Sequence, residues 1–592
     1  MPEGLTKAQK KNQKRKQKRD EQRPQTTAIV WLREDLRLHD NPALHQATQC
    51  GAIVIPVYIK DESDPSPWPL RGAALYWKYW SLKCFDNSLR GCGSRLTLRR
   101  GDALATIAQL AADTGATSVY WNRACEPWNV ERDEHVKESL QMNGIQVHDF
   151  KGVVLYEPWE ANPDDNAHRA GFGSVGFFRA ACERLGEPSK PLPAVEKLKA
   201  PLLWPASLTV DDLGYQRMPV RKGGEVVDWA ASIRQRWEFG EAGALRALDE
   251  FITSDASQKF ESRQRFRADR KWTAQISPYV RFGELSSRLI YWEAKRRIGH
   301  NCQTFIRRLF WRDLAYWTLW KFPSCHTEPL RPQYAHQRWG TDAAALKKWQ
   351  RGRTGFPLVD AAMRQLWAIG WMPNYLRHVV AGFLVEYMNM HWFEGFKWFD
   401  YTLVDSDVAI NAYMWQNGGH SGLDQWNFVM HPVYAAKSCD PEGNYVRQWV
   451  PELRHLPVEY VHCPWEAPVT LLASARVLLG RDYYRRTIDD LLAARRNSHK
   501  AVIEVREGVG KPYVLACGNE KMQLPDGRWV RLITRIDYRM MAANPVTVQT
   551  AADAWNKSKR RLLDQMSLAL ADEQRIYHQS HPDADEEEKA DL

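Results

Sequence analysis

The sequence lacks several patterns that would place it in a class of protein at once. None of its 10 cysteines belongs to a CxxC pair, and no group of histidines and cysteines has the spacing of a zinc site. No apolar run reaches the roughly 18 residues that a membrane-spanning helix needs, and we expect no signal peptide. These absences predict an intracellular protein with reduced thiols, without a metal site and without a membrane as its partner.

Length and charge set the next bounds. The chain has 592 residues, of which 44% are hydrophobic, so it can bury more than one core and we expect at least two domains. Its formal net charge is +11, and part of that charge lies in the basic segment 7–19. Such a segment is either a solvated tail, or a nuclear localisation signal or nucleic-acid-binding segment. Nuclear and cytoplasmic locations therefore both stay open. The 27 tryptophans are more than packing alone requires.

The first part of the chain alternates short β-rich runs with helix-like segments. This alternation predicts a Rossmann-like α/β domain, in which five parallel strands are covered by helices on both faces. The expected strands are 27–33, 52–59, 94–100, 117–121 and 145–150, and the expected helices are 71–90, 102–114 and 130–142.

The rest of the chain changes character twice. Residues 158–241 are rich in proline, glycine and charge, which predicts a segment that mostly connects two domains. After it come long patterns of 3.6-residue period, such as 305–320 and 376–392, which predict an all-α domain. Beyond that domain, residues 502–540 look strand- and loop-like, and the acidic end is expected to be disordered. The predicted divisions are a basic disordered arm at 1–26, the α/β domain at 27–157, a connector at 158–241, the helical domain at 242–501 and an extension at 502–592.

An unusual polar stripe interrupts the helical half. On a helix, Asp407, Asn411 and Trp415 are four residues apart and share one face. Asp405 lies at the start of the same helix, where a carboxylate is favoured, and a buried Arg377 would need such a partner. The pair is either a structural bridge or part of a pocket for a large polar aromatic cofactor.

Two further groups of residues allow both a structural and a functional interpretation. Thr273 and Ser277 precede Pro278, and hydroxyls in such a turn can contact a phosphate group or cap a helix. Tryptophans in a helical domain are usually core residues. Neighbouring indoles can also relay an electron from the surface to a buried acceptor, which requires a strongly oxidising or photoexcited cofactor.

Longer motifs, in collinear order, closely resemble the cryptochrome/photolyase family, on the side of plant-like cryptochromes and class I photolyases of cyclobutane dimers. The resemblance covers the chain from about residue 27 to residue 500. It implies an α/β domain that often holds a light-harvesting antenna of the folate or deazaflavin type, and an all-α domain that binds FAD. The motifs are VWLREDLRLHDNPAL (30–44), GFPLVDAAMRQLWAIGWMPNYLRHVVAGFLV (355–385), VDSDVAINAYMWQ (404–416), CDPEGNYVRQWVPEL (439–453) and CPWEAP (463–468).

The resemblance also implies roles for individual residues around the flavin. Arg377 and Asp405 would pair beside the isoalloxazine ring, Asp407 would support the cofactor, and Asn411 would lie opposite flavin N5. An amide at this last position is typical of photolyase-like flavin chemistry, whereas plant cryptochromes place an aspartate there. On the same basis Thr273 and Ser277 are the pyrophosphate contacts, Arg312 lies nearby, and Asn374 belongs to the cofactor and lesion pocket.

Three tryptophans match the electron-transfer triad of the family. Trp415 is the member next to the flavin, Trp392 the middle one and Trp339 the distal one. In the predicted mechanism, photoexcited FAD takes an electron from Trp415, which is refilled from Trp392 and then from Trp339.

The residues that hold a DNA lesion in photolyases are only partly present. Trp311 and Asn374 match, and His378 stands where the (6-4) enzymes have a histidine, although Asn374 replaces its companion. Contacts that photolyases of cyclobutane dimers use are replaced by Arg308, Tyr375, Asn417 and Phe428. The missing stacking and phosphate contacts, worth roughly 1–3 kcal/mol each, disfavour efficient repair of duplex DNA.

We therefore predict a blue-light photoreceptor that uses FAD photoreduction to signal through the extension to a protein partner. The alternative is a light-dependent photolyase of cyclobutane pyrimidine dimers that acts on single-stranded DNA, where flipping the lesion costs less. DNA binding would then be weak or dependent on a lesion.

Overall fold

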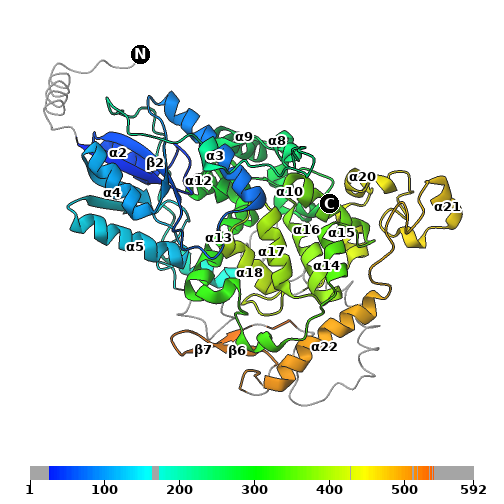
Figure 1. Ribbon diagram of the computed structural model, residues 1–592. Helices are drawn as coiled ribbons and strands as arrows, with labels where there is room; N and C mark the ends of the chain where they lie inside the picture. The colour runs from blue at the N-terminus through cyan, green and yellow to red at the C-terminus, as the bar shows by residue number, and fades with distance from the viewer. Residues whose placement is uncertain are drawn as a thin grey trace, which may run out of the picture.

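The computed structural model describes most of the chain. The basic arm and the acidic end lie outside the described residues, so the predictions about them stay predictions. The described residues are 26–162, 173–426, 428–509, 512–515, 518–532, 534–535 and 538. Figure 1 shows an α/β domain, drawn in blue and cyan, beside a larger helical domain in green and yellow, with an orange extension along one side of the helical domain.

The first domain is built on a five-stranded sheet in the order β3-β2-β1-β4-β5, in which every pair is parallel. Alternate residues of β1 enter different cores, with Val30 on the side of α2 and α3, and Trp31 on the side of α4 and α5. The sequence therefore predicted both the sheet and its two covered faces. The strands are β1 (Thr27–Leu32), β2 (Ile53–Asp61), β3 (Thr97–Gly101), β4 (Ala116–Asn122) and β5 (Gln146–Phe150), and the helices are α2 (Pro42–Gln49), α3 (Gly72–Gly91), α4 (Ala103–Thr114) and α5 (Pro127–Met142).

Local signals in the sequence fix the ends of these helices. The side chain of Asp102 accepts a hydrogen bond from the backbone N–H of Ala105 and so begins α4, and Gly115 ends it at a φ of 62°. Asn41 caps α2 in the same way, by accepting from the backbone N–H of Leu44. Such caps explain why the predicted boundaries lie within a few residues of the observed ones.

The second domain packs its helices around α13, which contacts both α18 and α7. α17 and α18 lie against each other, and α15 packs against α16 and α20. The helices are α7 (Val175–Arg184), α8 (Ala231–Arg236), α9 (Gly240–Thr253), α10 (Ala256–Glu261), α11 (Ser277–Arg281), α12 (Ser287–Arg297), α13 (Gln303–Lys321), α14 (Ala343–Gln350), α15 (Pro357–Ile369), α16 (Asn374–Gly382), α17 (Trp392–Thr402), α18 (Val408–Gly418), α19 (Pro432–Cys439), α20 (Asn444–Trp449) and α21 (Val469–Ser474).

The single helix predicted over 376–392 is wrong. α16 ends at Gly382 and passes into a π-helical turn, η7 (Phe383–Tyr387), after which Asn389 takes a left-handed φ of 51°. The backbone N–H of Gly340 donates to the carbonyl of Asn389 at 2.7 Å and holds this break. The apolar pattern continues across it because both sides face the same core, so periodicity alone did not reveal it.

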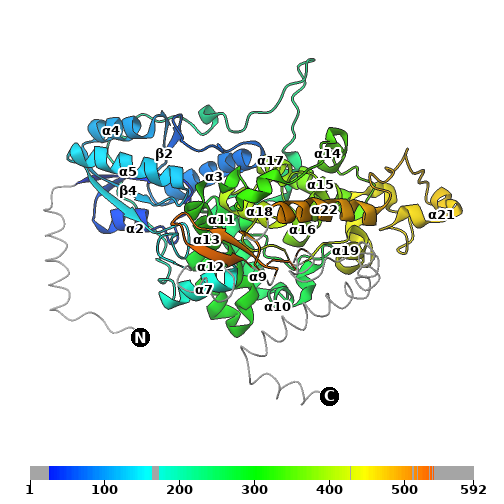
Figure 2. The same ribbon diagram turned by 90° about the horizontal axis from the view of Figure 1, so that it is seen from below.

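The extension begins differently from the prediction. Residues 502–509, expected as strand or loop, instead complete the long helix α22 (Leu491–Val509), which packs against η7. Two short antiparallel strands follow, β6 (Glu520–Gln523) and β7 (Trp529–Leu532). Figure 2 shows α22 lying along the helical domain. Among the described residues no helix is both long and apolar enough to cross a membrane.

Candidate functional site

A cavity with an empty volume of about 520 Å³ opens between α16, α17 and α18. It brings together five of the predicted cofactor residues, Asn374, Arg377, Asp405, Asp407 and Asn411, and also Trp415. These side chains come from segments up to 41 positions apart, so the fold and not the local sequence assembles them. The remaining lining is His378, Ala381, Phe399, Leu403, Ser406, Ile410, Met414 and Trp426.

Arg377 and Asp405 form the predicted ion pair at the cavity wall. An Nη of Arg377 lies 2.7 Å from Oδ2 of Asp405, and its Nε donates to the carbonyl of Met372. Oδ1 of Asp405 is buried and has no hydrogen-bond partner in the structure. Because buried polar atoms in native proteins almost always have a partner, this oxygen indicates that a donor group from a ligand belongs in the cavity.

Asp407 lies at the start of α18 and is held from two sides. Its carboxylate accepts from the backbone N–H of Ile410 at 3.1 Å and from the hydroxyl of Tyr316 at 2.8 Å. The guanidinium of Arg312 lies over the ring of Tyr316, 4.9 Å from its centroid, and donates to the carbonyl of Val153. Arg312 therefore reaches the site through Tyr316 and does not line the cavity itself.

Asn411 lies one turn into α18 and is buried. Its Nδ2 donates to the carbonyl of Phe396 on α17 at 3.1 Å, which fixes the orientation of the carboxamide at the cavity wall. A neutral amide in this position can accept or donate a hydrogen bond without adding charge.

The predicted phosphate contacts stand apart from the described cavity. Ser277 begins α11, and its hydroxyl accepts from the indole N–H of Trp371 at 3.1 Å. Neither Ser277 nor Thr273 lines the cavity, so their contact with a cofactor stays a prediction.

The three predicted tryptophans run from the cavity towards the surface. Trp415 and Trp392 are 2% and 1% exposed, and Trp339 is partly exposed. α17 and α18 come close because two glycines stand at their crossing: a Cβ on Gly395 would lie 2.0 Å from the ring of Trp415, and one on Gly419 would lie 2.6 Å from Cβ of Trp392.

His391 joins the second tryptophan to the third. Its ring centroid is 5.4 Å from that of Trp392 and 5.1 Å from that of Trp339. The backbone bridge between Gly340 and Met390 sets these two segments side by side. The arrangement supports the predicted order of the chain of indoles.

On the side of the cavity that would face a DNA lesion, Asn417 and Tyr375 offer no contact surface, in line with the expectation that these lesion contacts are missing. Asn417 is buried, and its Oδ1 accepts from the backbone N–H of Asp424, so it offers no surface for stacking. Tyr375 packs on Phe266, with ring centroids 4.9 Å apart, and does not line the cavity.

One cavity residue was missed in the sequence, Trp426. Its ring stacks on His378, with centroids 4.3 Å apart and an interplanar angle of 27°, and Phe428 continues the stack. Burial, with the cations of Arg308 and Arg377, lowers the pKa of His378 to about 3, so this histidine is neutral at physiological pH. Trp426 lies in a loop without periodicity, and no pattern marked it.

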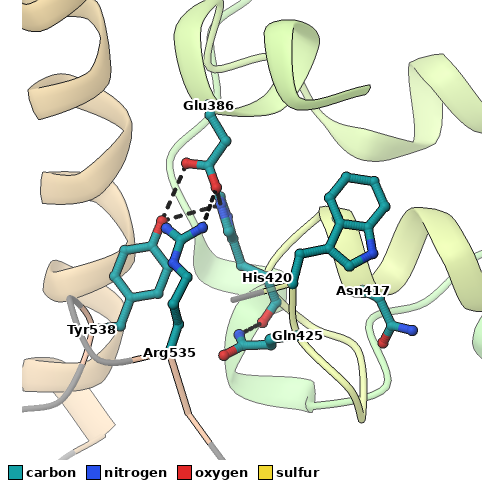
Figure 3. Close-up of a pocket in the computed structure, with 8 residues that line it drawn as sticks. Glu386, Asn417, His420, Gln425, Arg535 and Tyr538 are labelled. Carbon is teal, nitrogen blue, oxygen red and sulfur yellow. Dashed lines mark hydrogen bonds and ion pairs between the residues drawn. The ribbon is translucent and has the colours of Figure 1, made fainter. Parts of the chain in front are cut away.

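A second, smaller pocket joins the extension to the same loop. It is lined by Arg535 and Tyr538 of the extension and by Asn417, His420 and Trp426 of the helical domain. Figure 3 shows Arg535 and Tyr538 pointing at the carboxylate of Glu386. Of the extension, the sequence indicated only short strands, and the contacts of these two residues were not legible in it.

Comparisons with known proteins agree with this architecture. The family model described as DNA photolyase matches residues 28–196, and the one described as FAD binding domain of DNA photolyase matches residues 305–503. A deoxyribodipyrimidine photo-lyase of Agrobacterium fabrum is 37% identical over 79% of this chain and 96% of its own length. Cryptochrome-2 of Arabidopsis thaliana is 33% identical over 81% of this chain and 79% of its own.

Solved structures give the same result. A bacterial class III photolyase from Agrobacterium tumefaciens superposes with a TM-score of 0.76 at 35% identity, covering 82% of this chain and 98% of that one. A cryptochrome of Synechocystis superposes with a TM-score of 0.69 at 25% identity, covering 81% and 99%. Both photolyases and cryptochromes are therefore among the relatives that share this fold.

Proposed function

Because this chain belongs to the cryptochrome/photolyase family, we propose that it is a blue-light photoreceptor in which electron transfer through tryptophans changes the docking of the C-terminal extension. The helical domain is an FAD-binding domain by its family. The cavity fits such a cofactor, because it combines apolar walls with the unpartnered oxygen of Asp405 and the guanidinium of Arg377.

When bound, FAD supplies absorption of blue light and accepts an electron. Arg377 and Asp405 would hold it in the cavity, and Asn411 would offer a neutral hydrogen-bonding group. Trp415, which lines the cavity, is the first residue to give up an electron. Trp392 then returns an electron to Trp415, and Trp339 returns one to Trp392. The positive charge therefore moves from the cavity towards the surface.

The observation that carries the proposal is where the extension docks. Arg535 donates to Glu386 at 2.7 Å, and Tyr538 packs against His420 in the loop that follows α18. His420 in turn stacks on Trp339. The far end of the tryptophan chain and the anchor of the extension therefore share one residue.

Limited proteolysis of residues 502–592 in the dark and under blue light tests the proposal. We expect illumination to expose the extension, and Trp415→Phe to remove that response while leaving the dark pattern unchanged. Trp292→Phe is the matched control, because Trp292 is on α12 and outside the proposed tryptophan chain. Its indole N–H donates a hydrogen bond to the carbonyl of Pro188. Equal cleavage of the wild-type protein in light and dark would contradict the proposal.

A second candidate function rests on Trp426. Its stack with His378 gives the cavity an aromatic face that could take the place of the tryptophan missing at Asn417, and several relatives are photolyases. Reduced protein under blue light, given oligonucleotides with a cyclobutane dimer in single- or double-stranded DNA, tests repair directly. Turnover that Trp426→Ala abolishes would establish this function. The absence of turnover from protein that still photoreduces would reject it.

A further inference from the structure

The chain of aromatic residues does not end at Trp339. Its indole lies parallel to the imidazole of His420, with ring centroids 5.9 Å apart and an interplanar angle of 5°. The imidazole then meets Tyr538 of the extension, with centroids 5.6 Å apart and Nε2 of His420 at 3.3 Å from the phenolic oxygen. One more oxidisable side chain is therefore in ring contact with the series, and it lies beyond the region matched by the FAD-binding family model.

Two groups beside the hydroxyl of Tyr538 can take its proton, while an Nη of Arg495 donates to the phenolic oxygen at 3.3 Å. Besides His420, the carboxylate of Glu386 lies 3.3 Å from it, and both residues come from the helical domain. Burial lowers the pKa of His420, so its imidazole is neutral. In the tautomer whose Nδ1–H donates to Oε1 of Gln337, 3.4 Å away, the lone pair is on Nε2, the nitrogen that faces Tyr538. A phenol that loses an electron becomes a strong acid, so a base within hydrogen-bonding reach makes that oxidation easier.

The single carboxylate of Glu386 also anchors the extension. Arg535 binds it at 2.7 Å, and Arg495 of α22 binds it at 3.3 Å. Burial alone would raise the pKa of Glu386, but these two guanidinium groups hold it well below its usual range, so it is ionised. Nε2 of His420 is 3.4 Å from the same carboxylate. A proton on His420 would make a third cation that competes for one negative charge.

We propose that Tyr538 is a fourth electron donor and that its oxidation is what loosens the extension. Trp339, after losing an electron, regains one from Tyr538, and the phenolic proton of Tyr538 passes to Nε2 of His420. The products are neutral Trp339, a neutral tyrosyl radical and an imidazolium, so one positive charge is present before and after the step.

The consequence of this step is that a positive charge enters the group of ion pairs by which Glu386 holds the extension. Before the step, the positive charge is on Trp339, outside the ion pairs of Glu386. After it, the charge is on His420, between Glu386 and the two arginines, and it weakens the hold of the carboxylate on Arg535. This inference rests on the proposed function, because the photoexcited cofactor that the tryptophan chain serves is the oxidant.

The test compares radicals trapped by freezing under illumination, without added thiol, and observed by electron paramagnetic resonance. We expect a tyrosyl signal in the wild-type protein and its loss in Tyr538→Phe, which keeps the ring and its packing. Tyr513→Phe is the matched control, since Tyr513 lies in the same extension but packs on Trp529. A tyrosyl signal that persists in Tyr538→Phe, or is absent from the wild type, would overturn the inference.

A second measurement does not depend on the variant folding normally. Because a proton moves together with the electron, the decay of the tryptophan radical in wild-type protein should slow in D₂O, and an equal rate in H₂O and D₂O would count against the step. Trp415→Phe separates a failure of the proposed function from a failure of this inference. If photoreduction is unchanged in this variant, the proposed tryptophan chain is wrong. If photoreduction needs Trp415 but the tyrosyl signal does not need Tyr538, only this inference fails.

Discussion

At the scale of single residues, the most informative feature of the site is a buried hydrogen-bond acceptor that lacks a donor. Oδ1 of Asp405 has no partner, and this indicates a ligand more directly than the ion pair with Arg377, which a structural bridge would show equally well. The spacing of Asp407, Asn411 and Trp415 predicts a common helix face, and all three residues line the cavity; their roles towards the cofactor stay predictions. Trp426 could not be predicted, because its place depends on a loop that packs on α16 and not on any local period.

Gly395 provides a prediction at this scale. In Gly395→Ala, the new Cβ would lie 2.0 Å from the ring of Trp415, so the indole must move. We expect overpacking to lower the free energy of unfolding by about 1–3 kcal/mol and photoreduction to be slower. Chemical denaturation and the rate of flavin bleaching under blue light measure the two effects.

Gly382→Ala is the control for this change. Gly382 is also a buried helical glycine, but a Cβ there would meet nothing within 4 Å. Alanine favours a helix by about 0.8–1 kcal/mol over glycine, so this variant should be as stable as the wild type or more stable, with unchanged photoreduction. Equal behaviour of both variants would show that the crossing of α17 and α18 does not position Trp415.

At the scale of elements, the sequence predicted regular units and missed their interruptions. The strands of the first domain were predicted because alternation of strand and helix has few solutions. The break between α16 and α17 was not predicted, because it depends on a hydrogen bond from Gly340, some fifty positions away. The same break places Trp392 at the start of a helix, so the interruption matters for the site.

The docking of the extension should weaken in acid. His420 faces Glu386, Arg495, Arg535 and Tyr538, and burial lowers its pKa below the ordinary 6.5. His420 takes up a proton less readily when the extension is docked than when it is released. The free energy that favours docking therefore decreases as the pH falls below 6.5. Glu386, whose pKa is held well below 4.5, adds a second loss below that value.

Hydrogen exchange of 518–535 in the dark, measured over a range of pH and corrected for the intrinsic rate, checks this expectation. Protection should fall first as His420 takes up a proton. In His420→Gln, which cannot be protonated, the decline that begins near 6.5 should disappear and the one below 4.5 should remain. Protection that is constant down to 4.5 in the wild type would contradict the assignment.

At the scale of the whole molecule, the net charge of +11 is distributed along the chain, and part of it lies in the arm before the first strand. Any binding of nucleic acid should therefore have a large component that does not depend on sequence and falls steeply with salt. Removing residues 1–25 should reduce the slope of log K against log salt concentration for duplex DNA, by about 0.9 for each phosphate that the arm neutralises. Titration of fluorescent DNA at several salt concentrations measures this slope, and an unchanged slope would mean that the arm does not touch DNA.

The second anchor of the extension, Glu520, has a consequence for anyone who wishes to shorten this protein. Its carboxylate forms ion pairs with Arg331 and Arg506, both buried, and accepts from the hydroxyl of Tyr334 at 2.7 Å. A version cut near residue 503, where the match to the FAD-binding family model ends, would remove the counter-charge of Arg331, which is buried in the whole protein. We therefore expect a chain that ends near residue 503 to be less stable than one that extends to residue 538, and fusions to a reporter domain should begin after residue 538.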